Sequence, residues 1–109
     1  MTGKISLREK IQEIDDKPWS PIEVAKLNDQ VIRIALFDGE YPWHKHTKED
    51  ELFYVYKGRI IIQFKDKEDI LLNQGELAVV PKGVMHSPKS LEKSYILLFE
   101  PYTLRSRGD

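Results

Sequence analysis

The stretch HKHTKEDELFYVYKG, residues 44–58, decides how the rest of the chain is interpreted. Two histidines stand two positions apart, and a glutamate begins a run of aromatic and β-branched residues. Side chains at positions i and i+2 of a strand point to the same face. We therefore expect His44 and His46 to project together, with Lys45 pointing away. The pair fits either a metal site or a solvated pair beside a buried strand.

Glu51 begins the apolar run, and Phe53 and Val55 follow it at alternate positions. If these two hydrophobic side chains face a core, Glu51 faces the same core. A buried carboxylate requires a positive partner, and a divalent metal ion is one candidate. A salt bridge or a solvated strand end would explain Glu51 equally well.

The third histidine changes this balance. His86 follows the segment GELAVVPKGVM, residues 75–85, in which a strand ends in a Pro-Lys-Gly turn. Pro81 and Gly83 fit a tight turn that would aim His86 back toward the other two histidines. All three histidines of the chain therefore lie near β-turn elements that could bring them together.

The chain from residue 21 onward has the pattern of an all-β domain. Short segments rich in β-branched and aromatic residues are separated by turn signals such as Asp38-Gly39. The predicted strands are residues 22–27, 30–37, 51–56, 59–64, 69–72, 76–80 and 94–100. About eight short strands at this spacing indicate a closed barrel or a two-sheet roll.

A short helix is expected before the β-domain. Ser6 can cap the segment SLREKIQEI, and Glu9 stands three residues later, as in a capping box. We therefore divide the chain into a helix and lead-in (1–20), a β-barrel (21–104) and a polar tail (105–109) that we expect to be mobile.

Composition excludes several classes of function. The chain has 109 residues, which suits one domain, and its 17 basic and 18 acidic residues leave a net charge of −1. This balance gives no reason to expect nucleic acid or a membrane surface as a partner. The absence of cysteine excludes disulfides and thiolate ligands. The sequence shows no signal peptide and no apolar span, so we expect a cytoplasmic location.

Two motifs make the chain resemble the cupin superfamily. The first motif stands here as Gly39-x4-His44-x-His46-x4-Glu51-x6-Gly58, and the second as Gly75-x5-Pro81-x-Gly83-x2-His86-x3-Ser90. The resemblance covers about half of the chain and departs from the family pattern twice. One residue fewer separates Gly39 from His44, and Ser90 replaces an asparagine. Neither departure touches a position that holds the metal in the family.

The resemblance implies a double-stranded β-helix, or jelly-roll barrel, with one divalent transition metal ion per chain. Its ligands, carried over from the family motifs, are His44, His46, Glu51 and His86. The ligand types admit Fe, Mn, Ni, Co, Zn or Cu without selecting among them. Four ligands leave open positions on an octahedral ion, as catalytic metal sites require.

Two functions follow from the resemblance. The first is a small metalloenzyme, either a dioxygenase or an isomerase acting on a small carbonyl or polyhydroxy compound, with Glu51 as the candidate catalytic residue. The alternative is a non-catalytic module that binds or senses a small molecule. In both cases we expect a homodimer. The candidate pocket or interface aromatics are Phe37, Trp43, Phe53, Tyr54 and Tyr56, and Gln63 faces either the metal or solvent.

Overall fold

The computed structural model describes residues 3–109, which form one helix and seven strands. The helix α1 spans Leu7–Ile14. The strands are β1 (Ile22–Leu27), β2 (Gln30–Glu40), β3 (Glu51–Lys57), β4 (Arg59–Phe64), β5 (Ile70–Asn73), β6 (Leu77–Val80) and β7 (His86–Pro101). The prediction of an all-β jelly roll with a short N-terminal helix is therefore confirmed. Among residues 3–109, no helix is both long enough and apolar enough to cross a membrane.

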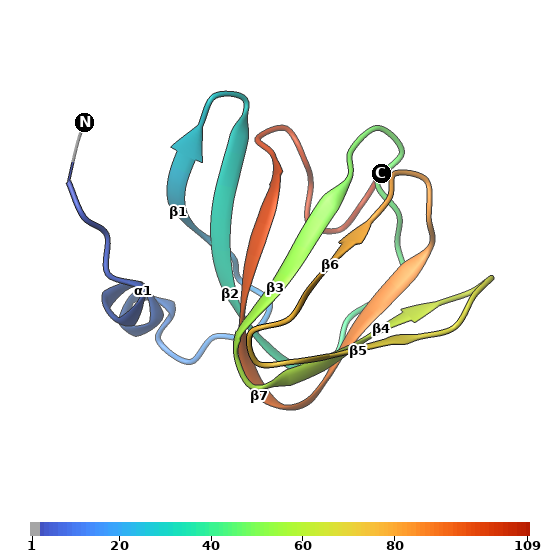
Figure 1. Ribbon diagram of the computed structural model, residues 1–109, viewed down its shortest axis with the longest axis horizontal. Helices are drawn as coiled ribbons and strands as arrows, with labels where there is room; N and C mark the ends of the chain where they lie inside the picture. Colours follow the sequence, from blue (N-terminus) through green and yellow to red (C-terminus); the bar gives the residue numbers. More distant parts are fainter. Residues whose placement is uncertain (1–2) are drawn as a thin grey trace.

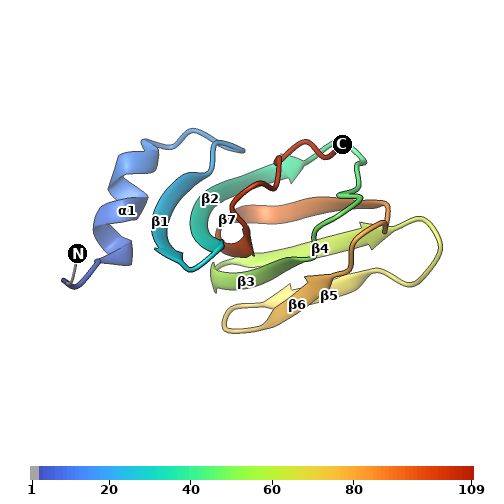
Figure 2. The same cartoon turned by 90° about the horizontal axis from the view of Figure 1, so that it is seen from above.

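All strand pairs within the sheet are antiparallel, and β7 connects its two parts. The second half of β7 lies between β2 and β3, giving the order β1-β2-β7-β3-β6. The first half of β7 pairs with β4, which in turn pairs with β5. Figures 1 and 2 show the strands wrapping into a barrel, with α1 outside it beside β1.

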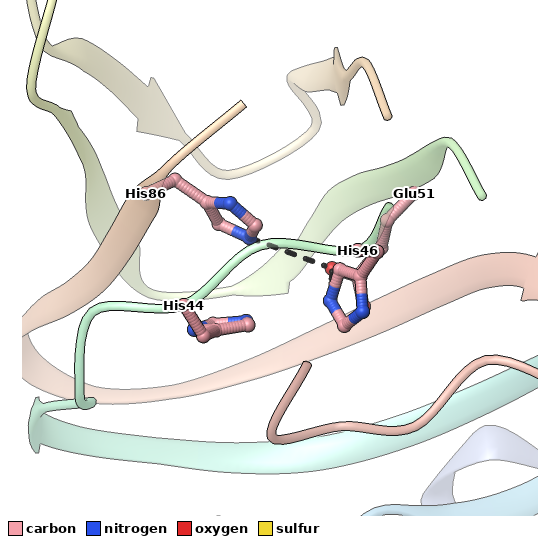
Figure 3. A group of neighbouring side chains, drawn as sticks. All are labelled: His44, His46, Glu51 and His86. Carbon is pink, nitrogen blue, oxygen red and sulfur yellow. Dashed lines mark ion pairs between the residues drawn. The ribbon is translucent and has the colours of Figure 1, made fainter. Parts of the chain in front are cut away.

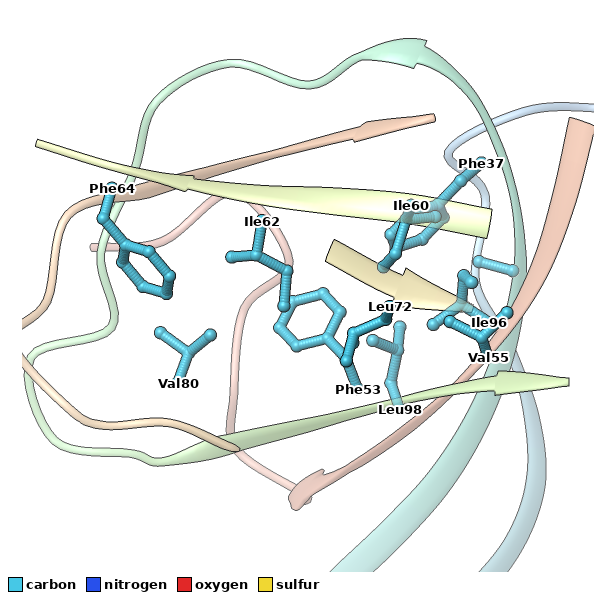
Figure 4. Close-up of a cluster of buried hydrophobic side chains, with 11 residues drawn as sticks. Phe37, Phe53, Val55, Ile60, Ile62, Phe64, Leu72, Val80, Ile96 and Leu98 are labelled. Carbon is cyan, nitrogen blue, oxygen red and sulfur yellow. The ribbon is translucent and has the colours of Figure 1, made fainter. Parts of the chain in front are cut away.

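The barrel interior holds the main hydrophobic core. Alternate residues of β4 and β3 point inward, as the period of two predicts. Figure 4 shows their side chains meeting those of neighbouring strands in one cluster. The buried members are Ala35, Phe37, Phe53, Val55, Ile60, Ile62, Phe64, Leu72, Val80, Ile96 and Leu98. Glu51 begins the inward-facing series of β3, so the core fixes the direction of this carboxylate.

The helix covers part of the outer face of the sheet. The Ser6 hydroxyl accepts a hydrogen bond from the Glu9 backbone N–H at 3.3 Å, which caps the first turn. Ile14 is buried in a second cluster with Ile34, Leu36 and Leu97. The sequence therefore predicted both the position of the helix and its cap.

The last strand differs from the prediction. It begins at His86 instead of residue 94 and runs to Pro101, while the seven predicted segments all form strands of the sheet. The polar segment after His86 reads as a loop because it contains Pro88. In the structure, Ser87 is fully buried and its hydroxyl donates to the Tyr41 carbonyl oxygen at 2.6 Å. The segment can therefore form a strand although its sequence is polar.

The polar tail contacts the loop that carries two of the histidines, and the prediction that it is mobile stays a prediction. Residues 105–109 fold back across the loop that carries His44 and His46, and the described chain ends beside that loop (Figures 1 and 2). The Asp109 backbone N–H donates to the Lys45 carbonyl oxygen at 3.1 Å. The Asp109 carboxylate accepts from the Thr47 backbone N–H at 2.8 Å. The end of the polar tail is therefore hydrogen-bonded to the loop of the site, while residues 105–107 and 109 are exposed.

Candidate metal centre

Two chain segments bring the candidate ligands together. His44 and His86 form an isolated antiparallel bridge, in which each backbone N–H donates to the other carbonyl oxygen at 3.0 and 2.9 Å. The Gly83 N–H donates to the His46 carbonyl oxygen at 2.8 Å. We expected the His-x-His pair on a strand, but it lies in an extended loop that these backbone bonds hold in place. Lys45 is exposed, as predicted.

The four predicted side chains converge inside the barrel mouth (Figure 3). Their exposed fractions are 9% for His44, 3% for His46, 5% for Glu51 and 0% for His86. One possible ligand atom of each lies within 4.8 Å of all the others. Glu51 points inward, as the sequence predicted. All four side chains are buried, so the alternative that they are solvated at the surface is excluded.

Backbone carbonyl groups orient two of the rings. The Nδ1 atom of His44 lies 2.9 Å from the Pro42 carbonyl oxygen, and that of His86 lies 2.9 Å from the Val84 carbonyl oxygen. A carbonyl oxygen only accepts, so Nδ1 carries the proton in both rings. This tautomer leaves each Nε2 with a free lone pair, which is the usual arrangement of a metal-binding histidine.

The unpartnered atoms of the site fit a metal ion. His46 Nε2, His86 Nε2 and Glu51 Oε1 are buried and have no hydrogen-bond partner. Glu51 Oε1 lies 3.3 Å from the first nitrogen and 3.8 Å from the second. Ligand bonds of about 2.0–2.2 Å to one ion would separate two ligand atoms by about 3 Å at a right angle and by about 4.2 Å when the atoms lie opposite each other. The two distances lie between these limits and match neither regular octahedral angle, but an ion would satisfy atoms that otherwise lose hydration without compensation.

The charge states of the site also suit a cation. Burial lowers the pKa of His44 to about 4, so this ring is neutral at ordinary pH. Burial alone would raise the pKa of Glu51, but the adjacent His46 ring outweighs it and lowers the pKa to about 2. Glu51 is therefore a carboxylate at neutral pH. Neutral imidazole and ionised carboxylate are the forms that bind metal.

Sequence reasoning missed a second carboxyl group beside the site. Leu52 of β3 pairs with Phe99 of β7. Because the two strands are antiparallel, the next opposing pair of residues is Glu51 and Glu100. Glu100 is 1% exposed, and its Oε2 lies 2.5 Å from an Arg33 guanidinium nitrogen. Its Oε1 has no hydrogen-bond partner. Burial and the charge of Glu51 raise the pKa of Glu100 to about 9. Ile96 and Leu98 point inward at alternate positions of the strand, and continuing this period of two would have predicted that Glu100 also points inward.

A small cavity of about 30 Å³ adjoins the ligands. Its wall is formed by Trp19, Pro21, Phe37, Tyr41, His44, Glu51, Phe53, Pro88, Leu98 and Ser106. Of the predicted aromatics, Phe37 and Phe53 are in this wall. Trp43, by contrast, lies under the Lys65 ammonium group at 4.3 Å.

Four further side chains that the sequence analysis named are not part of the cavity wall. Tyr54 and Tyr56 lie on the opposite face of β3 from Glu51, as the alternation predicted. Gln63 lies on the face of β4 that turns away from the core, and its amide donates to the Ser87 hydroxyl at 3.3 Å. Ser90, which replaces the asparagine of the motif, donates to the Glu92 carbonyl oxygen.

Comparison with known proteins gives consistent matches. A family model described as a cupin domain matches residues 35–99. The uncharacterized protein YdbB of Bacillus subtilis is 40% identical over 77 residues, which cover 71% of this chain and 68% of that protein. A cupin-2 domain-containing protein from Shewanella frigidimarina has a TM-score of 0.84 and 37% identity, over 89% of this chain and 93% of that one. Protein NMB1881 from Neisseria meningitidis has a TM-score of 0.82 and 27% identity, over 91% and 99%.

Proposed function

The chain belongs to the cupin domain family, and on this premise we propose that it is a mononuclear metalloenzyme that reacts a small, largely apolar substrate with dioxygen. The observation that carries the proposal is the convergence of three buried histidines and Glu51, whose ligand atoms lie within 4.8 Å of one another. The buried atoms without partners are the second support. The proposal covers one metal ion per chain.

The donor set suits a borderline-to-hard divalent ion, because imidazole and carboxylate are present and sulfur is absent. When bound, such an ion would supply Lewis acidity, open coordination positions and, in the case of iron or manganese, redox capacity. The proposed reaction has the form substrate + O2 → oxidised product, in which both oxygen atoms end in the product and the substrate supplies all four electrons, so no separate reductant is required.

The wall of the cavity favours an apolar substrate over a polyhydroxy compound. Apart from the candidate ligands, only Tyr41 and Ser106 offer polar side chains to the cavity. A substrate with several hydroxyl groups would lose its hydration there without gaining hydrogen bonds. The Trp19 ring packs against Phe37 and Tyr41 with centroid separations of 4.4 and 4.9 Å. These rings can hold a flat substrate and exclude water from it.

Glu51 remains the candidate catalytic residue. The His44 and His86 rings are fixed by their contacts with backbone carbonyl groups, and their role is to hold and orient the metal ion. A carboxylate can hold a proton that the substrate releases, whereas a neutral imidazole bound to metal does not accept one. The position of Glu51 on the cavity wall puts its carboxylate within reach of a bound molecule.

A module that binds or senses a small molecule is the second candidate function. The observation that favours it is the scarcity of polar groups in the cavity wall, because few side chains other than Glu51 can transfer a proton there. Such a protein would bind metal and ligand without turnover.

Oxygen uptake separates the two functions. Protein loaded with Fe(II) or Mn(II) is mixed with small phenols and, in parallel, with polyhydroxy compounds, and dioxygen is followed with an electrode. We expect uptake with phenols only. Glu51→Gln should lower turnover by about 10²–10⁴-fold more than it lowers metal content. The exposed Glu68→Gln is the matched control. A ligand that raises the melting temperature without oxygen uptake would support the binding module instead.

A further inference from the structure

The cavity beside the candidate ligands adjoins a larger hollow. The cavity, of about 30 Å³, has room for only the end of an organic molecule. The hollow, of about 570 Å³, is lined by Trp19, Glu40, Tyr41, Pro42 and Arg107. Trp19 and Tyr41 line both spaces, and both spaces are open to solvent. A molecule can therefore bind in the hollow with one end in the cavity beside the ligands.

The two shared aromatic residues form a fixed wall along this path. The Trp19 Nε1–H donates to the Asp38 carbonyl oxygen at 2.9 Å, and its ring centroid lies 4.9 Å from that of Tyr41. The Tyr41 backbone N–H donates to the Pro88 carbonyl oxygen at 2.9 Å. Both side chains are half-buried, so part of each ring is available to a bound molecule. The wall suits the flat apolar body of a substrate.

A β-turn places one polar side chain in each of the two spaces. The Gly108 backbone N–H donates to the Arg105 carbonyl oxygen at 2.9 Å, so Ser106 and Arg107 occupy the central positions of the turn. Ser106 lines the cavity, and Arg107 lines the hollow. Gly108 packs closely on the ligand loop, since an added Cβ would overlap the Lys45 carbonyl oxygen. The turn therefore lies directly beside the site.

The hollow contains a cation next to a hydroxyl group. Among residues 3–109, no carboxylate forms an ion pair with the exposed Arg107 guanidinium. Burial raises the pKa of Tyr41, and the Arg107 guanidinium beside its hydroxyl group acts in the opposite direction. Together the two groups offer N–H and O–H donors on one side of the hollow. Such donors suit a carboxylate, which accepts hydrogen bonds through both of its oxygens.

Glu40 determines which anion the hollow favours. It is the other charged residue in the wall, so one positive and one negative side chain face the same space. A carboxylate ligand carries a single negative charge, which one guanidinium balances. A phosphate monoester carries nearly two at neutral pH, and Glu40 would repel the additional charge. The hollow therefore favours a carboxylate over a phosphate.

We propose that Arg107 and the Tyr41 hydroxyl group form a carboxylate subsite, and that the substrate of the metal site is an aromatic carboxylate, an inference that rests on the proposed function. The aromatic body of the substrate lies along Trp19. Its carboxylate is bound in the hollow, and its other end lies in the cavity beside His44 and Glu51. Arg107 thus determines specificity, because binding of the charged end orients the reacting end.

The test compares two probes of the same shape that differ in charge, 4-hydroxyphenylacetate and its neutral amide. Binding to the full-length chain is followed by NMR through the indole N–H of Trp19, in a Trp43→Phe background that leaves one tryptophan. We expect the Kd of the acid to be about 5- to 10-fold lower than that of the amide. The difference should persist after chelator treatment, which excludes binding of the carboxylate to metal, and should shrink in about 0.5 M salt.

Two arginine variants locate the subsite. Arg107→Gln should abolish the difference between the acid and the amide. Arg105→Gln is the matched control, because it removes the same charge two positions away, from the wall of a separate hollow beside His46. It should keep the difference. Phenyl phosphate should bind more weakly than the acid, and Glu40→Gln should narrow that gap by about two- to fivefold.

Equal affinity for the acid and the amide in the unmodified chain would overturn the subsite, as would a difference that survives in Arg107→Gln. A Trp19 indole signal that does not move with the acid up to about 10 mM would also overturn it. Failure of the proposed function gives another result. A chain that binds no metal but keeps the charge-dependent binding would retain the subsite and lose the metalloenzyme. Oxygen uptake with uncharged phenols and none with the carboxylates would retain the metalloenzyme and overturn the substrate class.

Discussion

His44 and His86 exchange two backbone hydrogen bonds across the barrel mouth, at 3.0 and 2.9 Å, and their ring centroids lie 4.3 Å apart with the ring planes tilted by 50°. Residues 42 positions apart are thereby fixed as a pair before any metal is bound. A preorganised pair of ligands loses little conformational entropy when an ion binds. The site is therefore built into the fold and does not depend on side-chain rearrangement.

Metal should stabilise the folded protein, because the unfolded chain cannot assemble these four ligands. At a free metal concentration of about 100 times Kd, the free energy of unfolding should rise by about 2.7 kcal/mol. Thermal unfolding with and without a chelator measures this shift. An identical melting temperature in both conditions would show that metal binding does not stabilise the folded protein.

Stability of the metal-free protein should fall as pH rises from 6.5 to 9. The unfolded chain releases the Glu100 proton near its ordinary pKa of 4.5, whereas the folded state keeps it to about 9. The folded state thus binds more protons within this window, and stability decreases as pH increases. His44 acts in the opposite direction, but only between about 4 and 6.5.

Urea unfolding of chelator-treated protein across this pH range checks the prediction. Glu100→Gln keeps the shape of the side chain and removes its titration, so the slope between pH 6.5 and 9 should disappear. A slope that persists unchanged in this variant would assign the effect to other groups.

Gly58 should tolerate no side chain. Its φ is +100°, and an added Cβ would overlap Ser94 in β7. Gly58→Ala should lose about 1–2 kcal/mol from the left-handed backbone and about 1–3 kcal/mol more from the overlap. Gly75→Ala has the same backbone cost without the overlap. Denaturant unfolding of both variants tests the difference, and equal losses would show that only the backbone matters.

We also predict a homodimer formed through the outer face of the sheet. Val79 pairs with Leu52, which pairs with Phe99, and Leu77 pairs with Tyr54, so apolar side chains form two adjacent rows. Leu77 is 55% exposed and Val79 is 49% exposed. A self-complementary apolar face of this kind suits a two-fold contact between identical chains.

Light scattering should show a species of twice 12.8 kDa for the unmodified chain and a monomer for Val79→Lys. Leu71→Lys is the control, since Leu71 is 51% exposed on β5, outside these rows. A monomer of 12.8 kDa for the unmodified chain at micromolar concentration would rule the dimer out.

Much of the fold could be predicted from the sequence, because it depends on short-range patterns, and the four candidate ligands followed from the resemblance to the cupin motifs. Alternation from Glu51 to Val55 gave the inward direction of the carboxylate, and the spacing of His44 and His46 gave their common direction. The turn before His86 then pointed that side chain at the other two.

The features that the sequence did not predict depend on contacts between segments that lie far apart in the chain. The polar start of β7 is a strand because Ser87 finds the Tyr41 carbonyl oxygen across the barrel. Glu100 is buried because Arg33 of another strand pairs with it. The tail lies over the site because Asp109 meets the ligand loop. Only the inward direction of Glu100 has a local signal, in the alternation from Ile96 and Leu98, and the distant partners of Ser87, Glu100 and Asp109 have none.

Metal content measures the central claim most directly. Protein purified without chelators or affinity tags that bind metal should hold about one transition metal ion per chain. His46→Ala and His86→Ala should lose most of it, whereas Lys45→Ala, which changes the exposed residue between two ligands, should keep it. Equal metal content in the unmodified protein and in both the His46→Ala and His86→Ala variants would contradict the account.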